Sequence, residues 1–330
     1  MSILDALHPA IHHDAIEGFE AVTLAAGELE AAFVPSLGMV GASLRHAGEE
    51  LLDRRDGLAA YREAGTVMGV PFLHPWANRL AGDEYELHGR RVRLPAGPPR
   101  RNDEHGLPIH GLVAGHPGWS VLGLHADARS ARLAARLDFA ADPALRAAFP
   151  FAHDVVVEVT LRPQDLRIAT TVIPTGGAPV PIAFGYHPYL RLPGVDRSRW
   201  ELGFPPRRRL ELDARKLPTG AVEPRPGERF VLADRAFDDS FDEIADGAVF
   251  TLAGGGREFA VTHHAGYPVA QVFSPPGAPF VCLEPMTAPT NALRTGSGLR
   301  RAIPGRPYTA RFSIGVRAAG RRREQPRGEP

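Results

Sequence analysis

The sequence has almost no cysteine or lysine: Cys282 and Lys216 are the only ones among 330 residues. No intrachain disulfide can form, which fits a reducing compartment and leads us to expect a cytoplasmic protein. A Schiff-base mechanism would have Lys216 as its one candidate nucleophile. No apolar run approaches the roughly 20 residues of a membrane span. Residues 1–20 have neither the basic nor the apolar segment of a signal peptide.

Net charge is also missing, because 38 Lys and Arg residues balance 38 Asp and Glu residues. A nucleic-acid-binding protein or one recruited to anionic lipid would carry a basic excess, so we expect neither partner. The motifs GxGxxG, GxxxxGK[ST], HExxH and GxSxG do not occur. Nucleotide cofactors and a hydrolase nucleophile elbow are therefore unsupported.

Turn-forming residues are abundant, with 35 glycines and 32 prolines. So many breakers favour short strands joined by turns, and most segments show the alternating pattern of half-buried strands. The sequence predicts an all-β fold of sandwich or barrel type. The clearest predicted strands and hairpins are Ala21–Pro35 continued by Met39–Leu52, Tyr85–Leu94 around His88 and Gly89, Val155–Leu161 with Leu166–Ile173, and Tyr308–Val316. Gly254 begins a glycine run that reads as a hairpin turn.

Helix candidates are few and short, at Leu58–Glu63 and Pro143–Ala147. No internal repeat or long linker interrupts the chain. We therefore expect residues 1–316 to form one domain and residues 317–330 to form a disordered basic tail.

Two loop-like segments carry polar residues suited to binding. Asn78 and Arg79 follow an apolar, proline-rich stretch, and an arginine offers a rigid fork of donors for two oxygens at once. His105, His110 and His116 lie within a short segment further on. These histidines suit either a solvated loop or a metal site, and both alternatives stay open on this pattern alone.

Two further segments suit proton transfer. His187 is framed by Gly185, Tyr186, Pro188 and Tyr189, which restrict the backbone around one imidazole. Glu284 follows an apolar strand-like run, so burial should raise its pKa and make it a stronger base. A packed core histidine and a surface glutamate at a strand end are the alternatives.

Taken together and in order, these strings resemble the aldose 1-epimerase (galactose mutarotase) family. The matching pieces are PWANR, IHG, GYHPY, FDDSF and LEPMTAPTNA, and the resemblance covers roughly Gly18 to Val316. It implies a large antiparallel β supersandwich. Two positions depart from the family pattern: Leu112 stands where a second glycine is usual, and Leu190 where an aromatic residue is usual.

The resemblance also implies roles for individual residues. His187 matches the general acid and Glu284 the general base, which together would interconvert the α and β anomers of a free aldose by proton transfer, so we expect no cofactor and no resident metal. In that scheme Glu284 acts as a carboxylate and His187 as an imidazolium, since ordinary values near 4.3 and 6.5 give a base and a partial acid. The implied substrate contacts are Asn78, Arg79, His110, Tyr189, Asp238 (rather than Asp239) and Gln271.

The expected partner is a small sugar, most simply an aldohexose, bound by a monomer or homodimer. Two other classes stay open. One is a non-catalytic sugar-binding protein of the same fold. The other is a metal-dependent β-barrel enzyme that uses His105, His110 and His116.

Overall fold

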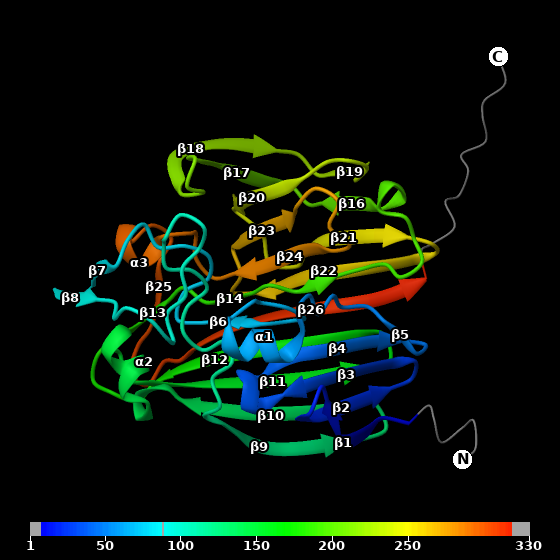
Figure 1. The fold of residues 1–330 in the computed structure, drawn as a ribbon, viewed down its shortest axis with the longest axis horizontal. Helices are drawn as coiled ribbons and strands as arrows, with labels where there is room; N and C mark the ends of the chain where they lie inside the picture. The colour runs from blue at the N-terminus through cyan, green and yellow to red at the C-terminus, as the bar shows by residue number, and fades with distance from the viewer. Residues whose placement is uncertain (1–7, 88, 319–330) are drawn as a thin grey trace.

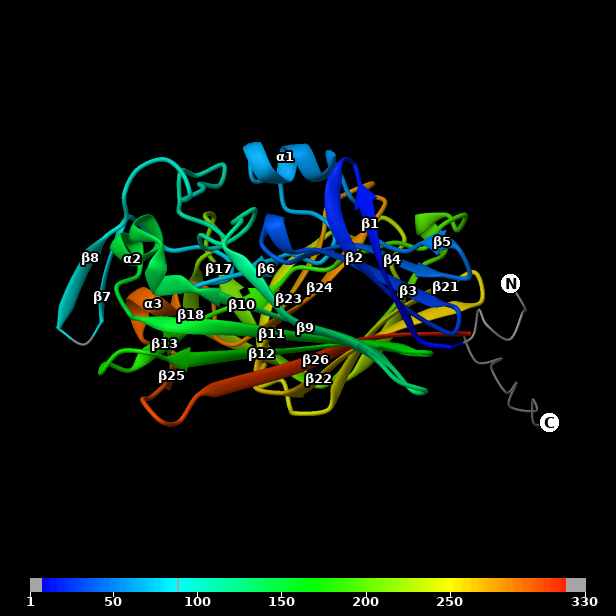
Figure 2. The same cartoon turned by 90° about the horizontal axis from the view of Figure 1, so that it is seen from below.

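The protein, described by a computed structural model over residues 8–87 and 89–318, is built almost entirely from antiparallel strands (Figure 1). A nine-stranded sheet forms one layer, and an eight-stranded and a five-stranded sheet lie over it (Figure 2). The expected all-β supersandwich is confirmed. No helix in the described ranges is long and apolar enough to cross a membrane.

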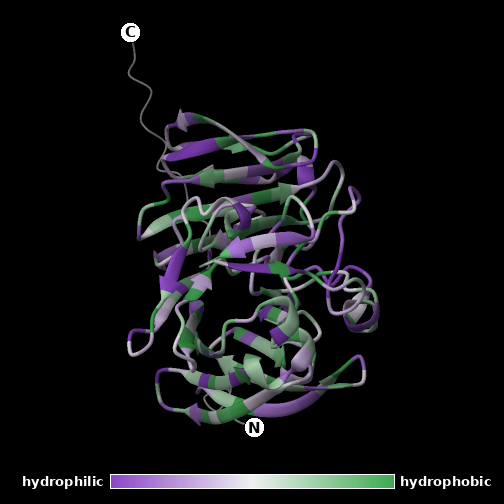
Figure 3. Ribbon diagram, turned by 90° about the vertical axis from the view of Figure 1, so that its left-hand side faces the viewer, coloured by the Kyte–Doolittle hydropathy of each residue, from purple (hydrophilic) through white to green (hydrophobic). Residues whose placement is uncertain are grey.

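The nine-stranded sheet brings together strands from the middle and the end of the chain. In spatial order its strands are β19 (Glu228–Val231), β16 (Glu201–Phe204), β21 (Ala248–Gly254), β22 (Arg257–Ala265), β26 (Tyr308–Ala318), β12 (Asp165–Pro174), β11 (His153–Arg162), β10 (Ala131–Asp138) and β9 (Trp119–Ala126). Buried and partly exposed residues alternate along β11 and β12, which is why their sequence predicted a hairpin. Figure 3 shows the same mixture of apolar and polar residues along the strands.

The eight-stranded sheet carries most of the residues of interest. Its order is β18 (Pro218–Arg225), β17 (Arg207–Leu212), β20 (Phe237–Asp242), β23 (Val269–Ser274), β24 (Val281–Met286), β14 (Gly185–Tyr186) and β6 (Phe72–Leu73), with β15 (Tyr189–Leu190) also paired to β24. All six residues of β24 are buried, so this strand crosses the interior.

The five-stranded sheet is formed by the start of the described chain. Its strands are β1 (Ala10–Ile16), β2 (Phe19–Ala26), β3 (Leu29–Val34), β4 (Val40–His46) and β5 (Glu49–Glu50). β2 and β3 pack on β10 and β11, and Leu24, Phe33, Leu133 and Val157 belong to one hydrophobic core between these layers. Burial of this apolar surface drives the two layers together.

Two small sheets and a few short helices complete the fold. The sheets pair β13 (Val180–Ile182) with β25 (Arg300–Ala302), and β7 (Glu84–Leu87) with β8 (Arg90–Arg93). The helices are α1 (Gly57–Glu63), α2 (Pro143–Ala148), α3 (Ala292–Thr295) and the 3₁₀ turns Pro35–Leu37, Phe139–Ala141 and Arg197–Arg199. Both predicted helices and the predicted hairpins are confirmed, although His88 lies outside the described residues.

The predicted tail begins too early. Residues 317 and 318 continue β26, and the Arg317 guanidinium donates hydrogen bonds of 3.0 and 2.6 Å to Glu258 Oε1. The pairing of β26 with β22 extends to this point, because Glu258 lies opposite Arg317 and Arg257 lies opposite Ala318. Residues 319–330 lie outside the described chain, so a tail there stays a prediction.

Candidate active site

A cavity of about 230 Å³ lies over β20, β23 and β24, and every catalytic or substrate-binding residue implied by the family resemblance lines it. These residues are Asn78, Arg79, His110, His187, Tyr189, Asp238, Gln271 and Glu284. Arg55, Val67, Glu104, Ile109 and Phe273 complete the lining. Segments more than 200 residues apart in sequence therefore converge on one site.

Strand register explains how three of these side chains meet. Ser240 on β20 lies opposite Gln271 on β23, which lies opposite Glu284 on β24. Residues paired in this way point to the same face of a sheet, and Asp238, two residues from Ser240, joins them. Glu284 lies inside β24 rather than just beyond it, and its relative exposure is only 1%.

His187 is held between β14 and β15. Its backbone N–H donates to the Pro71 carbonyl at 3.3 Å, and its ring stacks on the Tyr189 ring at 4.6 Å with an angle of 12°. His110 and Phe273 approach the same imidazole edge-on, at 5.3 and 5.9 Å between ring centroids. Rings on several sides fix the orientation of the imidazole.

The imidazole and the carboxylate form a close buried pair. His187 Nε2 lies 3.3 Å from Glu284 Oε1, yet neither carboxylate oxygen has a hydrogen-bond donor among the described residues. Buried polar atoms are nearly always satisfied in folded proteins. The exceptions at Glu284 therefore mark a place where a ligand that donates hydrogen bonds would be stabilised.

The charge state expected from ordinary pKa values is wrong for this pair. Burial, with smaller effects from Arg55 and Arg79, lowers the pKa of His187 to about 3. Burial and the neighbouring charge of Asp238 raise the pKa of Glu284 well above its usual range. Desolvation penalises both charged forms, so the protein's own groups favour a neutral imidazole beside a protonated carboxyl. This neutral pair holds the same number of protons as the imidazolium–carboxylate pair.

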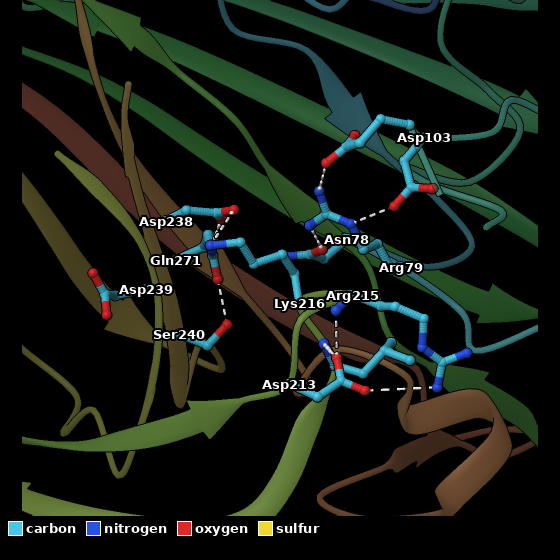
Figure 4. A network of polar contacts seen from close by, with 12 residues as sticks. Asn78, Arg79, Asp103, Asp213, Arg215, Lys216, Asp238, Asp239, Ser240 and Gln271 are labelled. Atoms are coloured by element: carbon cyan, nitrogen blue, oxygen red, sulfur yellow. Dashed lines mark hydrogen bonds and ion pairs between the residues drawn. The ribbon is translucent and has the colours of Figure 1, made fainter. Parts of the chain in front are cut away.

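Arg79 is held by its neighbours before any ligand binds. Its Nε donates to Asp103 Oδ2 at 2.6 Å, and its Nη1 donates to Asn78 Oδ1 at 3.1 Å (Figure 4). Nη2 lies 3.5 Å from Glu104 Oε1. The guanidinium is therefore preset at the cavity wall, with a relative exposure of 8% for the residue.

The loop that carries His110 is tied to the loop that carries Arg79. The His110 N–H donates to the Asn78 carbonyl at 3.0 Å, and Arg79 and Ile109 form an isolated antiparallel bridge. Asn78 and His110 both have left-handed backbone, with φ of 57° and 60°. Non-glycine residues seldom adopt this conformation, and it often accompanies functional sites.

Asp238 is held from two directions (Figure 4). Gln271 Nε2 donates to its Oδ1 at 2.7 Å, and Lys216 Nζ lies 3.3 Å from its Oδ2. The neighbouring Asp239 instead pairs with Arg209 and does not line the cavity.

The three-histidine metal hypothesis finds no support in the geometry. Only His110 reaches the cavity, while His116 pairs with Asp142 at 3.0 Å and His105 lies beside Glu104 at 3.7 Å. Over residues 8–87 and 89–318, no three or more His, Cys, Asp or Glu side chains are grouped as metal ligands.

The two positions that depart from the family pattern lie away from the cavity. Leu112 and Leu190 have relative exposures of 2% and 0% and pack in the hydrophobic core. Neither side chain lines the cavity. The departures therefore alter core packing rather than the surface that a ligand would touch.

Sequence reasoning missed several residues of the site. Arg55 and Phe273 line the cavity, and Asp103 holds Arg79. The sequence signal for Asp103 is its turn-forming surroundings, with Asn102 before it and Gly106 after it. In the structure its side chain accepts from the N–H groups of His105 and Leu107 in an Asx-type turn. Arg55 follows β5 in a loop, and nothing in its local sequence distinguishes it from a surface arginine.

Comparison with solved structures identifies the fold as that of the galactose mutarotase-like proteins. A galactose mutarotase-like protein from Clostridium acetobutylicum superposes with a TM-score of 0.83 at 19% identity, over 94% of this chain and 99% of that one. A galactose 1-epimerase from Lactobacillus acidophilus gives a TM-score of 0.74 at 13% identity, over 95% and 100%.

The family follows from the sequence match. The aldose 1-epimerase family model matches residues 20–315, which is most of the chain. The chain belongs to the aldose 1-epimerase family, and the resemblance drawn from its motifs is confirmed.

Proposed function

We propose that this protein is a mutarotase that interconverts the α and β anomers of a free aldose. The observation that carries the proposal is the buried His187–Glu284 pair, 3.3 Å apart, whose carboxylate oxygens have no donor of their own and face a cavity lined with polar side chains. Family membership supports an isomerase of this class.

Anomer interconversion requires the hemiacetal ring to open and close again. Glu284 accepts the proton of the anomeric hydroxyl, and His187 donates a proton to the ring oxygen, so the C1–O5 bond breaks and an aldehyde forms. Rotation about C1–C2 exposes the other face of the aldehyde. The two groups then reverse their roles as the ring closes.

The ligand itself supplies what the reactive charge state needs. A sugar hydroxyl that donates to Glu284 favours the carboxylate form, and Arg79, whose charge lowers the pKa of Glu284, acts in the same direction. The proton lost by the carboxyl is then available to His187, because only 3.3 Å separates the two groups. Each positioned proton transfer contributes about 10²–10⁴ in rate.

The remaining polar residues are suited to holding sugar hydroxyls. Arg79 and His110 come from two loops that are bridged to each other, and Asp238 and Gln271 come from the paired strands β20 and β23. Charged groups give the stronger hydrogen bonds, so Arg79 and Asp238 should contribute most to affinity. Tyr189 supports the imidazole of His187 through ring stacking.

Polarimetry on a panel of free and phosphorylated aldoses tests the function. We expect the protein to accelerate anomer equilibration of at least one free aldose well beyond the uncatalysed rate. Activity should survive dialysis against a chelator, since proton transfer by Glu284 and His187 suffices. Sugar binding without acceleration would instead support a non-catalytic sugar-binding protein, and loss of activity restored by a divalent ion would support the metal-dependent alternative.

A further inference from the structure

Asp238 lies at the boundary between two cavities. It lines the catalytic cavity, and it also lines a neighbouring open cavity of about 450 Å³. Lys216, the only lysine of the chain, lines the second cavity and not the first. Lys216 therefore approaches Asp238 from the second cavity and not from the catalytic one.

The contacts of Asp238 divide between its two oxygens. Gln271 Nε2 donates to Oδ1 at 2.7 Å, while Lys216 Nζ lies 3.3 Å from Oδ2. Gln271 is fixed in turn, because its Oε1 accepts a hydrogen bond from Ser240 Oγ. Rotation of the carboxylate would break both contacts, so the two partners together define its orientation.

The turn between β17 and β18 presents Lys216 in a preset position. The Lys216 N–H donates to the Asp213 carbonyl at 2.9 Å, and Asp213 Oδ1 accepts from the N–H groups of Arg215 and Leu217 at 2.8 and 3.0 Å. Lys216 itself has left-handed backbone, with φ of 63°. Leu217 anchors the turn with a relative exposure of 5%.

We propose that Lys216 is a positioning residue, which orients and partly neutralises the Asp238 carboxylate so that Asp238 binds a hydroxyl of the sugar. The proposal rests on the proposed function for the identity of the ligand. It assigns a purpose to the single lysine other than covalent catalysis. Because Lys216 does not line the catalytic cavity, its effect on the sugar passes through Asp238.

Steady-state kinetics of Lys216→Met test this assignment. The side chain is 39% exposed, so we expect the modest effect typical of solvated ion pairs, a rise in KM of about two- to fivefold with kcat nearly unchanged. Lys216→Arg keeps the charge and should restore KM. Arg215→Met is the matched control, since Arg215 belongs to the same turn but its guanidinium approaches Asp213, 3.6 Å away, rather than Asp238.

A double-mutant cycle with Asp238→Asn shows whether Lys216 acts through Asp238. We expect Lys216→Met to raise KM no further once the carboxylate is an amide. An unchanged KM for Lys216→Met, an equal rise for Arg215→Met, or a full additional rise in the Asp238→Asn background would each overturn the proposal.

Failure of the proposed function can be distinguished from failure of this inference. Calorimetric titration of the same variants with the aldose gives the Kd ratios without requiring turnover. If the protein binds the sugar but does not interconvert its anomers, a two- to fivefold weaker Kd for Lys216→Met still supports the positioning role. A protein that binds no aldose contradicts both proposals.

Discussion

At the scale of single residues, the site depends on two ionisable groups held away from water at a short distance. Desolvation moves the pKa of His187 down to about 3 and that of Glu284 up, so the pair keeps one transferable proton over a wide pH range. Such groups titrate as a coupled pair rather than singly. The pH dependence of kcat/KM measures the width of that range.

We therefore predict a broad pH profile. kcat/KM, corrected for the uncatalysed reaction, should stay nearly constant between about pH 5 and pH 7, because the pair gains a second proton only as the pH approaches the lowered pKa of His187. With ordinary pKa values, the one-proton state would dominate only between about 4.3 and 6.5. A single-proton change in kcat/KM centred near pH 6.5 would contradict the account.

Arg79 provides a second test at this scale. Its three nitrogens face Asn78, Asp103 and Glu104, an arrangement that one ammonium group cannot reproduce. Arg79→Lys should lower kcat/KM by roughly 10- to 150-fold, which corresponds to the loss of about 1.5–3 kcal/mol of charge-assisted hydrogen bonding.

Arg100→Lys is the control for this substitution. Arg100 precedes Asp103 by three residues and pairs with Asp83 at 3.3 Å, but it does not line the cavity. We expect its kcat/KM to stay within about twofold of the wild type, because its side chain is not part of the cavity lining. An unchanged kcat/KM for Arg79→Lys on every accepted sugar would remove Arg79 from the binding site.

At the scale of elements, the candidate site combines strands β20, β23 and β24 with loops that are held in place by backbone hydrogen bonds. Gly111 forms a bridge with His74, and the Leu112 N–H donates to the His74 carbonyl at 2.7 Å. Gly111 has a φ of 72°, and a Cβ there would overlap the His74 carbonyl. The position directly after His110 therefore requires glycine.

Gly111→Ala should consequently destabilise the fold by about 3 kcal/mol, combining the strain of left-handed backbone with steric overlap. It should also lower activity by displacing His110. Gly106→Ala is matched to it, since Gly106 has a φ of 73° but a Cβ there meets nothing within 4 Å. We expect a cost of about 1 kcal/mol for the control. Denaturant unfolding of both variants measures the difference, and equal costs would show that the overlap is relieved.

The elements also show how far the sequence alone could lead. β11 and β12 were predictable because alternating burial leaves its pattern in the residues, and the turn between them is polar. β14 and β15 were not, because the segment around His187 is buried on all sides and does not alternate. Local pattern carries no information about a strand of two residues whose pairing is set by distant β6 and β24.

The candidate site likewise contains features that the sequence could predict and features that it could not. Eight of the residues that line the cavity were found through motifs, but the proton distribution of His187 and Glu284 was predicted wrongly because burial had not been taken into account for the histidine. Arg55 and the contact between Lys216 and Asp238 escaped prediction because they depend on where loops come to lie in the folded chain.

At the scale of the whole molecule, buried histidines link stability to pH. His153 and His263 have relative exposures of 0% and 1%, and burial lowers the pKa of each to about 4. His153 Nε2 lies 2.8 Å from His74 Nε2, and its Nδ1 lies 2.5 Å from the Phe151 carbonyl, an arrangement in which one imidazole must act as acceptor. Protonation of both His74 and His153 would leave no acceptor between the two rings and would break this hydrogen bond.

In the unfolded chain, His153 and His263 become protonated as the pH falls through about 6.5. In the folded protein they stay neutral until the pH falls to about 4. These two histidines therefore leave the free energy of unfolding at its full value above pH 6.5 and reduce it as the pH falls below that value. We predict a loss of about 2 kcal/mol for each of the two histidines between pH 7 and pH 5. Urea unfolding measured across this range checks the slope, which His153→Gln should reduce. A free energy of unfolding independent of pH would refute the prediction.

The central claim is that Glu284 and His187 exchange protons with the sugar, and the turnover number of Glu284→Gln tests it most directly. The amide preserves the shape of the side chain but cannot accept the anomeric proton. With folding verified by circular dichroism and aldose binding by calorimetry, we predict a kcat about 10²–10⁴ below that of the wild type. A Glu284→Gln variant that binds the aldose and interconverts its anomers at a rate close to the wild type would contradict the account.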